Sequence, residues 1–472
     1  MLPAMPRAGW VKPETDQRLS DHVALGVLTR TFPPALVDAV LADTGRAEQR
    51  TRLLPARLVV YYVMALALFA QASYEEVMRN LTEGLAWADG WRREPAVPSK
   101  SAIFQARARL GVPPLEALFD RACVPLGTPD TPGAFYRSWR VVSLDGTTID
   151  VADTEANAAA FGRAGTGRGE GSAFPQVRVV ALGECGTHAI FAAAMASYDT
   201  GEVTLAKQLT GGLRPGMLCL ADRGFTAHPL FAAAAASGAD LLWRAKGNAV
   251  LPVLERFPDG SFRSELVATP DKRAREQVTA VRVVEYAIDD PGRPQAEETR
   301  YRLLTTILDP ERAPADELAA LYAQRWEIES TFDELKTHQR GPKVVLRSKT
   351  PEGVRQEAYG VLCVHYAIRA LMHAAGDDAG VDPDRISFTR SLRAARRSVR
   401  TQQGTAPQAL AAALVAAIRE ICAELLPLRR LRAAARVVKR KMSNYGVKRA
   451  EHRAWPHPTR LVAEAVRVLA PP

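Results

Sequence analysis

The sequence predicts a mixed α/β core that follows a helical block and precedes a helical, basic region. In the middle of the chain, short apolar runs alternate with helical patterns in the order three strands, helix, strand, helix, strand. Such an order is typical of one sheet with helices packed on it. The chain has 472 residues, which is enough for two to four structural units.

The chain is expected to begin with a flexible segment and a helical domain. Residues 1–20 are rich in proline and charge, which favours a poorly ordered N-terminus. Residues 21–130 carry apolar side chains at helical spacing and are predicted to form a helical N-terminal domain. The most apolar stretch, residues 58–70, is too short to span a bilayer and is predicted to be a buried helix.

The α/β core is predicted to occupy residues 131–375. Its first elements are expected to be strands at residues 139–144, 176–183, 187–193, 217–221 and 239–245, and helices at residues 204–213 and 226–237. The first and the fourth of these strands each run directly into an aspartate. Active sites in α/β folds gather at strand ends, so these two aspartates are candidates for chemistry.

A β-rich insertion and two helices are expected to complete the core. Residues 247–310 combine several prolines with alternating apolar and polar runs, which indicates a mostly β insertion. Helices are predicted at residues 317–336 and 352–375. Residues 376–472 are expected to form a helical, basic C-terminal region.

The composition favours a cytoplasmic globular protein. Hydrophobic residues make up 47% and charged residues 24%, so bulk disorder is not expected. The N-terminus has no secretory-signal pattern. The cysteines are odd in number and widely spaced, so neither a zinc site nor a disulfide framework is indicated. They are interpreted as small buried hydrophobic residues: Cys123, Cys185, Cys219, Cys363 and Cys422.

The positive charge of the chain favours a partner rich in phosphates. The formal net charge is +10, and each phosphate that a basic side chain neutralises releases a counterion. Much of the charge lies in residues 429–460, where Tyr445 and Trp455 are interleaved with basic residues that include Arg436, Lys439, Arg440 and Lys441. The pattern is compatible with a nucleic-acid contact surface and equally with a solvated tail.

Asp145 and Asp222 are the aspartates that follow the two predicted strands. Asp145 precedes Gly146, and Asp222 lies in the run Ala-Asp-Arg-Gly-Phe. A single Asp-Gly after a strand usually marks a turn. Two carboxylates at the ends of separate strands of one sheet instead indicate a metal site, since Mg²⁺ prefers oxygen ligands and is held by few carboxylates plus substrate phosphate.

A third acid lies on the helix predicted at residues 317–336. This helix has the pattern Y-x2-R-x3-E-x6-K, formed by Tyr322, Arg325, Glu329 and Lys336. At about 100° per residue, these side chains fall within a stripe of about 60° on one face. A solvated face with helix salt bridges is the alternative interpretation. Glu327 and Glu334 lie on other faces and are weaker metal-ligand candidates.

These motifs together resemble the IS4 family of DDE transposases, the group that includes the Tn5 transposase. The resemblance covers nearly the whole chain and is carried by "SLDGTTIDVADTEANAAAFG", "LADRGF", "YAQRWEIESTFDELK" and the basic "RVVKRKMSNYGVKR". It implies an RNase H-like catalytic core with the β insertion before the helix that carries the glutamate. It also implies that the helical N-terminal domain binds DNA.

The resemblance further implies a metal-dependent, cut-and-paste mechanism. Asp145, Asp222 and Glu329 would hold two Mg²⁺ ions, for which Mn²⁺ may substitute, and these would activate the attacking oxygen and stabilise the leaving one. Water would release a 3′-OH at the element's end, which forms a hairpin with the opposite strand. After water reopens the hairpin, the 3′-OH would attack target DNA.

The resemblance also assigns DNA contacts. Tyr322, Arg325 and Lys336 would hold phosphates near the element's end. A hairpin requires one base to leave the stack, and Tyr301 is the aromatic residue at the matching position, where Tn5-like members use tryptophan. Trp326 and Trp243 are other candidates for stacking on this base, although both are expected to lie in the core.

The expected partner is double-stranded DNA, as the terminal inverted repeats of the element and as target DNA. The resemblance implies a homodimer that pairs two DNA ends in the bacterial cytoplasm at the nucleoid, with no membrane contact. Two alternatives are a metal-dependent nuclease of the same fold that does not transfer strands, and an inactive DNA-binding relative. The acidic residues argue against the second, since clustered carboxylates repel phosphate.

Overall fold

The chain forms two units, each assembled from three separate stretches. In this computed structural model, the first unit comprises Met1–Pro132, Gly146–Gly201 and Ser330–Leu426, and the second comprises Gly133–Asp145, Glu202–Glu329 and Pro427–Pro472. The structure describes residues 23, 25–48, 52, 54–82, 97–165, 172–267, 278–289, 300–342, 344–401, 407–427, 437–438, 446–447, 449–450 and 462–471.

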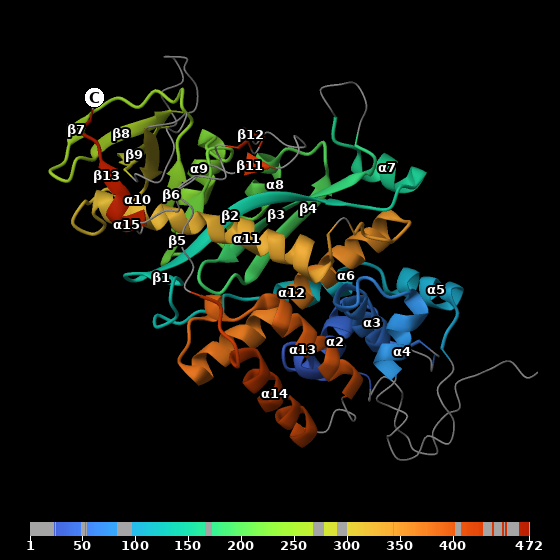
Figure 1. The fold of residues 1–472 in the computed structure, drawn as a ribbon. Helices are drawn as coiled ribbons and strands as arrows, with labels where there is room; N and C mark the ends of the chain where they lie inside the picture. Colours follow the sequence, from blue (N-terminus) through green and yellow to red (C-terminus); the bar gives the residue numbers. More distant parts are fainter. Residues whose placement is uncertain are drawn as a thin grey trace, which may run out of the picture. The chain divides into compact units, whose positions relative to one another are not determined.

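The second unit contains a sheet in the strand order β2, β5, β6, β10, β9, β8, β7 (Figure 1). The strands are β2 (Trp139–Asp150), β5 (Met217–Ala221), β6 (Asp240–Arg244), β7 (Glu255–Arg256), β8 (Phe262–Val267), β9 (Val278–Ile288) and β10 (Tyr301–Thr305). The short strand β1 (Phe135–Tyr136) pairs with β2. The mixed α/β class predicted from the sequence is confirmed.

The parallel part of this sheet is buried because helices cover it. Every residue of β5 is buried, as the continuous apolar run MLCLA predicts for a parallel strand covered on both faces. The helices α8 (Glu202–Gln208) and α9 (His228–Ala235) follow β4 and β5 along the chain. On α9, Phe231 packs edge-to-face on Trp243 of β6, with ring centroids 5.1 Å apart.

The β insertion extends the sheet directly. β10 pairs antiparallel with β6, with Leu304 opposite Trp243, and on its other side β10 pairs with β9. The predicted strands within residues 247–310 are confirmed. They pair with the parallel strands instead of forming a separate sheet.

The helix predicted over residues 317–336 is interrupted, and this expectation was wrong. The structure has α10 (Ala315–Leu321), a 3₁₀ turn η4 (Tyr322–Arg325), α11 (Trp326–Asp333) and a π-helical segment η5 (Glu334–Gln339). The last of these belongs to the first unit. A 3₁₀ turn winds more tightly than an α-helix, so side chains after it leave the stripe calculated for a continuous helix.

The first unit combines helices with the hairpin of β3 (Gln176–Glu184) and β4 (Ile190–Ser197). Its helices are η1 (Gly26–Arg30), α2 (Pro34–Asp43), α3 (Ala56–Leu68), α4 (Tyr74–Thr82), α5 (Lys100–Leu110), α6 (Pro113–Ala122), α7 (Glu155–Phe161), α12 (Pro351–Ala379), η6 (Pro383–Arg385), α13 (Phe388–Thr401) and α14 (Pro407–Cys422).

Helix α3 is the predicted buried helix, and this expectation is confirmed. All but one of its residues are buried, and it packs on α12. At the crossing, a Cβ on Gly360 would lie 3.0 Å from the carbonyl oxygen of Val63, so glycine lets the two helices approach closely without displacing the backbone. Within the described residues, no helix is both long enough and apolar enough to cross a membrane.

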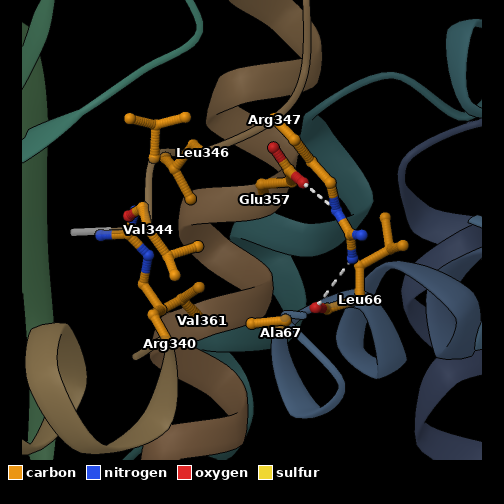
Figure 2. Close-up of a pocket in the computed structure, with 10 residues that line it drawn as sticks. Leu66, Ala67, Arg340, Val344, Leu346, Arg347, Glu357 and Val361 are labelled. Atoms are coloured by element: carbon orange, nitrogen blue, oxygen red, sulfur yellow. Dashed lines mark hydrogen bonds and ion pairs between the residues drawn. The ribbon is translucent and has the colours of Figure 1, made fainter. Parts of the chain in front are cut away.

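A small pocket in the first unit contains a buried ion pair (Figure 2). The Arg347 guanidinium lies 3.5 Å from the Glu357 carboxylate, and it donates a hydrogen bond of 3.3 Å to the carbonyl oxygen of Leu66. Arg340 also lines the pocket, and burial lowers its pKa to about 10. Through Arg347, the pocket ties Glu357 of α12 to Leu66 of α3.

The C-terminal region is helical only in part. After α14, the described residues include short strands, and one of them, β13 (Val466–Val468), pairs with β9. The expected helical region therefore ends in a strand that pairs with the last residues of β9. The basic residues Arg436, Lys439, Arg440 and Lys441 lie outside the described residues, as do residues 1–20.

The cysteine interpretation is supported by the structure. None of the five cysteines, all of which lie in the described residues, forms a disulfide, and four of them are buried.

Candidate active site

Asp145 and Asp222 lie side by side on neighbouring parallel strands. The register of β2 with β5 ends at the pair Leu144 and Ala221, so the next residue on each strand is an aspartate. Adjacent strands are about 4.8 Å apart, and residues in register point to the same face of a sheet. The two carboxylates therefore share one location at the carboxyl end of β5.

The strand that carries Asp145 does not end there, contrary to the sequence prediction. β2 runs on through Gly146 to Asp150, so the Asp-Gly pair is extended backbone and not a turn. The side chain of Asp145 is 17% exposed. Pairing of β2 with β5 reaches the preceding residue, Leu144, and the strand continues past Asp145, which is a more rigid position than a turn would provide.

The backbone after Asp222 folds back on its own carboxylate. The Gly224 N–H donates a hydrogen bond of 2.8 Å to Asp222 Oδ1, and a Cβ on Gly224 would lie 2.9 Å from the same oxygen. The next residues anchor this turn, since Phe225 is buried and the Thr226 hydroxyl donates a bond of 2.5 Å to the carbonyl oxygen of Arg244. One Asp222 oxygen is thus fixed, and a side chain at position 224 would displace the Asp222 carboxylate from this position.

Arg325 links Glu329 to Asp145. Its Nη2 donates a hydrogen bond of 2.9 Å to Glu329 Oε1, and its Nη1 lies 3.9 Å from Asp145 Oδ2. Burial alone would lower the pKa of Arg325, but Tyr322, Glu329 and Asp145 reverse this and raise it, so the guanidinium is charged. The Arg325 guanidinium therefore lies between two of the three predicted metal ligands, Glu329 and Asp145.

Tyr322 connects the same turn to Asp222. Its ring is buried, and its hydroxyl donates a hydrogen bond of 3.1 Å to the carbonyl oxygen of Ala221, the residue before Asp222. Burial raises the pKa of this hydroxyl well above its usual value. The 3₁₀ turn thus lies against the end of β5, and the hydroxyl of Tyr322 is engaged inside the protein.

The three predicted ligands do not close on a metal position in this structure, since one oxygen from each is not within 4.8 Å of the other two. All three belong to the second unit, and their donors are carboxylate oxygens, the ligand type that Mg²⁺ prefers. The guanidinium of Arg325 already supplies positive charge between Asp145 and Glu329. The side chain of Glu329 is 31% exposed, so the group is open to a ligand from solvent.

Lys336 belongs to the first unit, seven residues after Glu329. Its ammonium donates a hydrogen bond of 3.1 Å to the Thr147 hydroxyl. Burial lowers the pKa of Lys336, although the carboxylate of Asp150 acts in the opposite direction.

The three aromatic candidates have different surroundings. Trp243 is fully buried, as expected. Trp326 is 50% exposed, so its expected place in the core was wrong, and the 3₁₀ turn before it accounts for the difference. The ring of Tyr301 stacks on Tyr286 of β9, with centroids 5.2 Å apart, and the Arg244 guanidinium of β6 lies 4.8 Å from its centroid.

Arg244 was not identified from the sequence. Besides its contact with Tyr301, it contributes to the electrostatic environment of the Tyr322 hydroxyl. The available signal was its position as the last residue of β6, the strand beside β5, at the same end as Asp222.

Comparison with known proteins supports the family resemblance. Residues 22–120 match the insertion element 4 transposase N-terminal model, and residues 138–367 match the transposase DDE domain. Transposase InsG for insertion sequence element IS4, from Escherichia coli (strain K12), is 28% identical over 417 residues, or 87% of this chain and 91% of that protein. Putative transposase InsZ of the same strain is 24% identical over 229 residues, or 48% of this chain and 74% of that protein.

One solved structure is also similar. A piggyBac transposase in a synaptic complex with hairpin DNA aligns with a TM-score of 0.40 and 12% identity, covering 88% of this chain and 83% of that one. The DDE domain makes the protein an enzyme that cleaves DNA and transfers strands with the help of a divalent metal. The helical N-terminal domain and the α/β domain occur in the order of the two matching models, and the chain belongs to the IS4 family of DDE transposases.

Proposed function

We propose that this insertion-sequence transposase uses Asp145, Asp222 and Glu329 as its metal ligands and moves its element by a cut-and-paste route with hairpin ends. The observation that carries the proposal is the link through Arg325, whose guanidinium reaches both Glu329 and Asp145, the in-register neighbour of Asp222. We propose further that the core is RNase H-like. The parallel order β2, β5, β6 supports this assignment.

The proposed metal is Mg²⁺, with two ions and with Mn²⁺ as a substitute. When bound, the metal would activate the attacking oxygen and stabilise the leaving oxygen of an in-line displacement. The fixed turn after Asp222 and the paired strand at Asp145 keep both carboxylates oriented before any ligand arrives. Preorganisation of this kind avoids the cost of ordering the ligands during the reaction.

Arg325 is proposed to bind a phosphate of the element's end. Its Nε is buried and has no hydrogen-bond partner among the described residues, so the guanidinium retains donor capacity beyond Glu329. A planar guanidinium suits bidentate phosphate contact. Tyr322 is proposed to support the site through Ala221, and Lys336 to contact phosphate as a point charge.

The proposed partner is duplex DNA, at the terminal inverted repeats of the element and at the target. A homodimer that pairs two ends is part of this proposal, as is action at the bacterial nucleoid. The basic residues Arg436, Lys439, Arg440 and Lys441 are proposed to contribute further phosphate contacts.

Strand transfer separates a transposase from a nuclease of the same fold. Incubation of the protein with pre-cut element ends and a supercoiled target in Mg²⁺ is expected to yield joined products, because a free 3′-OH can replace water as the attacking group. Gel analysis of labelled ends measures the joined fraction. Cleavage of uncut ends without any joining of pre-cut ends would instead identify a nuclease.

Trp326 is the aromatic residue that we propose to stack on the flipped base, with Tyr301 second. The two contacts of Tyr301 come from the strands on either side of β10, so both faces of its ring are covered. Trp326 is half-exposed, lies one turn before Glu329 on α11, and has the Arg325 guanidinium 4.7 Å from its ring centroid. Base stacking on an aromatic ring contributes about 1–3 kcal/mol.

Trp326→Ala is therefore expected to slow hairpin formation about 5- to 150-fold while first-strand nicking changes less. Tyr301→Ala is the matched variant, and its hairpin step is expected to change less than that of Trp326→Ala. Single-turnover kinetics of the two steps on a labelled end measure both effects. An equal loss of nicking and hairpin formation in Trp326→Ala would remove the base-capture role.

A further inference from the structure

Helix α13, with the sequence FTRSLRAARRSVRT, has one apolar face and one basic face. Arg393, Arg397 and Arg400 are all exposed. They are spaced by four and three residues, so they form one stripe along the helix. None of the acids predicted for catalysis lies on this helix, and the site described above does not use it.

The apolar face of α13 is held firmly in the first unit. Leu392, Ala395 and Val399 are buried, and the helix packs against α12, α14 and η1 (Figure 1). Ser398 on this face accepts a hydrogen bond of 3.1 Å from the N–H of Val27. Because this face is fixed, the stripe of arginines has a fixed direction toward solvent.

Arg396 ties α13 to the segment that carries Lys336. Its Nε donates a bond of 2.6 Å to the carbonyl oxygen of Leu68, and its Nη2 donates a bond of 3.2 Å to the carbonyl oxygen of Gln339 at the end of η5. The Thr389 hydroxyl lies 3.5 Å from Nδ1 of His338 in the same segment. The stripe therefore begins beside η5, the element of Lys336.

The charges of the stripe are only partly neutralised. Arg397 pairs with Glu420 of α14. No carboxylate among the described residues pairs with Arg393 or Arg400, and Arg400 instead lies 5.8 Å from the ring centroid of Phe69. At least two guanidinium groups on a rigid surface are therefore available to an anionic partner.

We propose that Arg393, Arg397 and Arg400 form a track for the phosphate backbone of duplex DNA, which continues from the contact proposed for Lys336. From Arg393 to Arg400 the helix rises about 10 Å, which spans about three base pairs at 3.4 Å each. Phosphate contacts position DNA without reading its sequence, so the track serves element ends and flanking DNA alike. The proposal rests on the proposed function in that the partner is DNA.

The test is a salt titration of DNA binding without divalent metal, so that no strand is cut. Fluorescence anisotropy is measured with a duplex that carries the element's end and with a random duplex. In Arg393→Ala/Arg400→Ala, the slope of log K against log salt is expected to fall in magnitude by about 1.8, that is about 0.9 per lost phosphate contact. The loss of affinity is expected to be similar for both duplexes.

Three further variants keep the test independent of folding. Arg393→Lys/Arg400→Lys retains the charge and is expected to keep the wild-type slope. Glu420→Gln removes the carboxylate that pairs with Arg397 and is expected to tighten binding. Lys207→Ala/Arg214→Ala removes the same charge from exposed positions before β5, at the end of that strand away from Asp222, and is expected to leave the slope unchanged.

An unchanged slope in Arg393→Ala/Arg400→Ala, or an equal fall in the Lys207 and Arg214 control, would overturn the track. If Arg393→Ala/Arg400→Ala bound an acidic protein less tightly while its DNA binding was unchanged, the track would also be overturned. The stripe would then be assigned to a protein partner. Strand transfer by the wild-type protein in Mg²⁺ tests the proposed function separately. The track can therefore fail while that function stands.

Discussion

Replacement of Asp145, Asp222 or Glu329 with alanine is expected to reduce cleavage of the element's end by more than about 10³-fold, equivalent to about 4 kcal/mol of transition-state stabilisation. Each carboxylate would supply metal-binding oxygens that no neighbouring group replaces. DNA binding is expected to survive, since removal of a negative charge from a phosphate-binding surface does not weaken attraction to DNA. Cleavage assays and anisotropy on the same variants measure the two properties.

Asp333 provides a matched control on the same helix. It is the last residue of α11, and its carboxylate is 61% exposed and pairs with His338. Asp333→Ala is expected to cleave at nearly the wild-type rate. If one of the three proposed ligands tolerates alanine at full activity, that residue does not hold the metal.

The second large effect is expected at Glu334, which lies at the centre of a buried ionic cluster in the first unit. Its carboxylate lies 3.1 Å from Arg369, 3.2 Å from His365 and 3.4 Å from His188. Asp384 completes the cluster, at 3.4 Å from His188 and 3.6 Å from Arg369. Burial alone would raise the pKa of Glu334, but Arg369 and the histidines hold it well below 4.5.

Glu334→Ala is therefore expected to lower the free energy of unfolding by about 3–5 kcal/mol, because it leaves the buried charge of Arg369 without its main partner. Urea denaturation of the variant and the wild type measures the difference. As a control, Asp377→Ala removes a carboxylate that is 56% exposed and pairs with His373, and its effect is expected to be within about 1 kcal/mol. A Glu334→Ala variant as stable as this control would contradict the structural role of the cluster.

The pH dependence of the free energy of unfolding follows from the lowered pKa of Glu334. Glu334 has a lower pKa in the folded than in the unfolded protein, so its contribution is complete above pH 4.5 and is lost as the pH falls toward its folded value. Glu334→Gln is expected to make the free energy of unfolding depend less on pH below pH 4.5.

Local patterns were sufficient to predict the strands around the site. The run MLCLA is apolar throughout, and only a strand covered on both faces buries such a run next to an aspartate. The order of strands and helices then indicated a sheet, and Asp145 and Asp222 followed as residues at the carboxyl ends of two predicted strands. Their common register could not be predicted, because register depends on pairing between distant segments.

The interrupted helix could not be predicted from periodicity. The pattern from Tyr322 to Lys336 fits a continuous helix, yet the chain tightens into a 3₁₀ turn at Tyr322 and widens into a π-helix at Glu334. Tertiary contacts accompany both departures, since the Tyr322 hydroxyl bonds to Ala221 and Glu334 is held in its ionic cluster. The exposed position of Trp326 follows from the first departure.

The most direct test of the central claim is the location of a divalent ion in crystals of the protein with DNA carrying the element's end, grown in Mn²⁺. Anomalous scattering is expected from ions within about 2.5 Å of carboxylate oxygens of Asp145, Asp222 and Glu329. Manganese bound elsewhere with these three side chains free of metal, or Glu329 remote from an ion held by the two aspartates, would contradict the assignment.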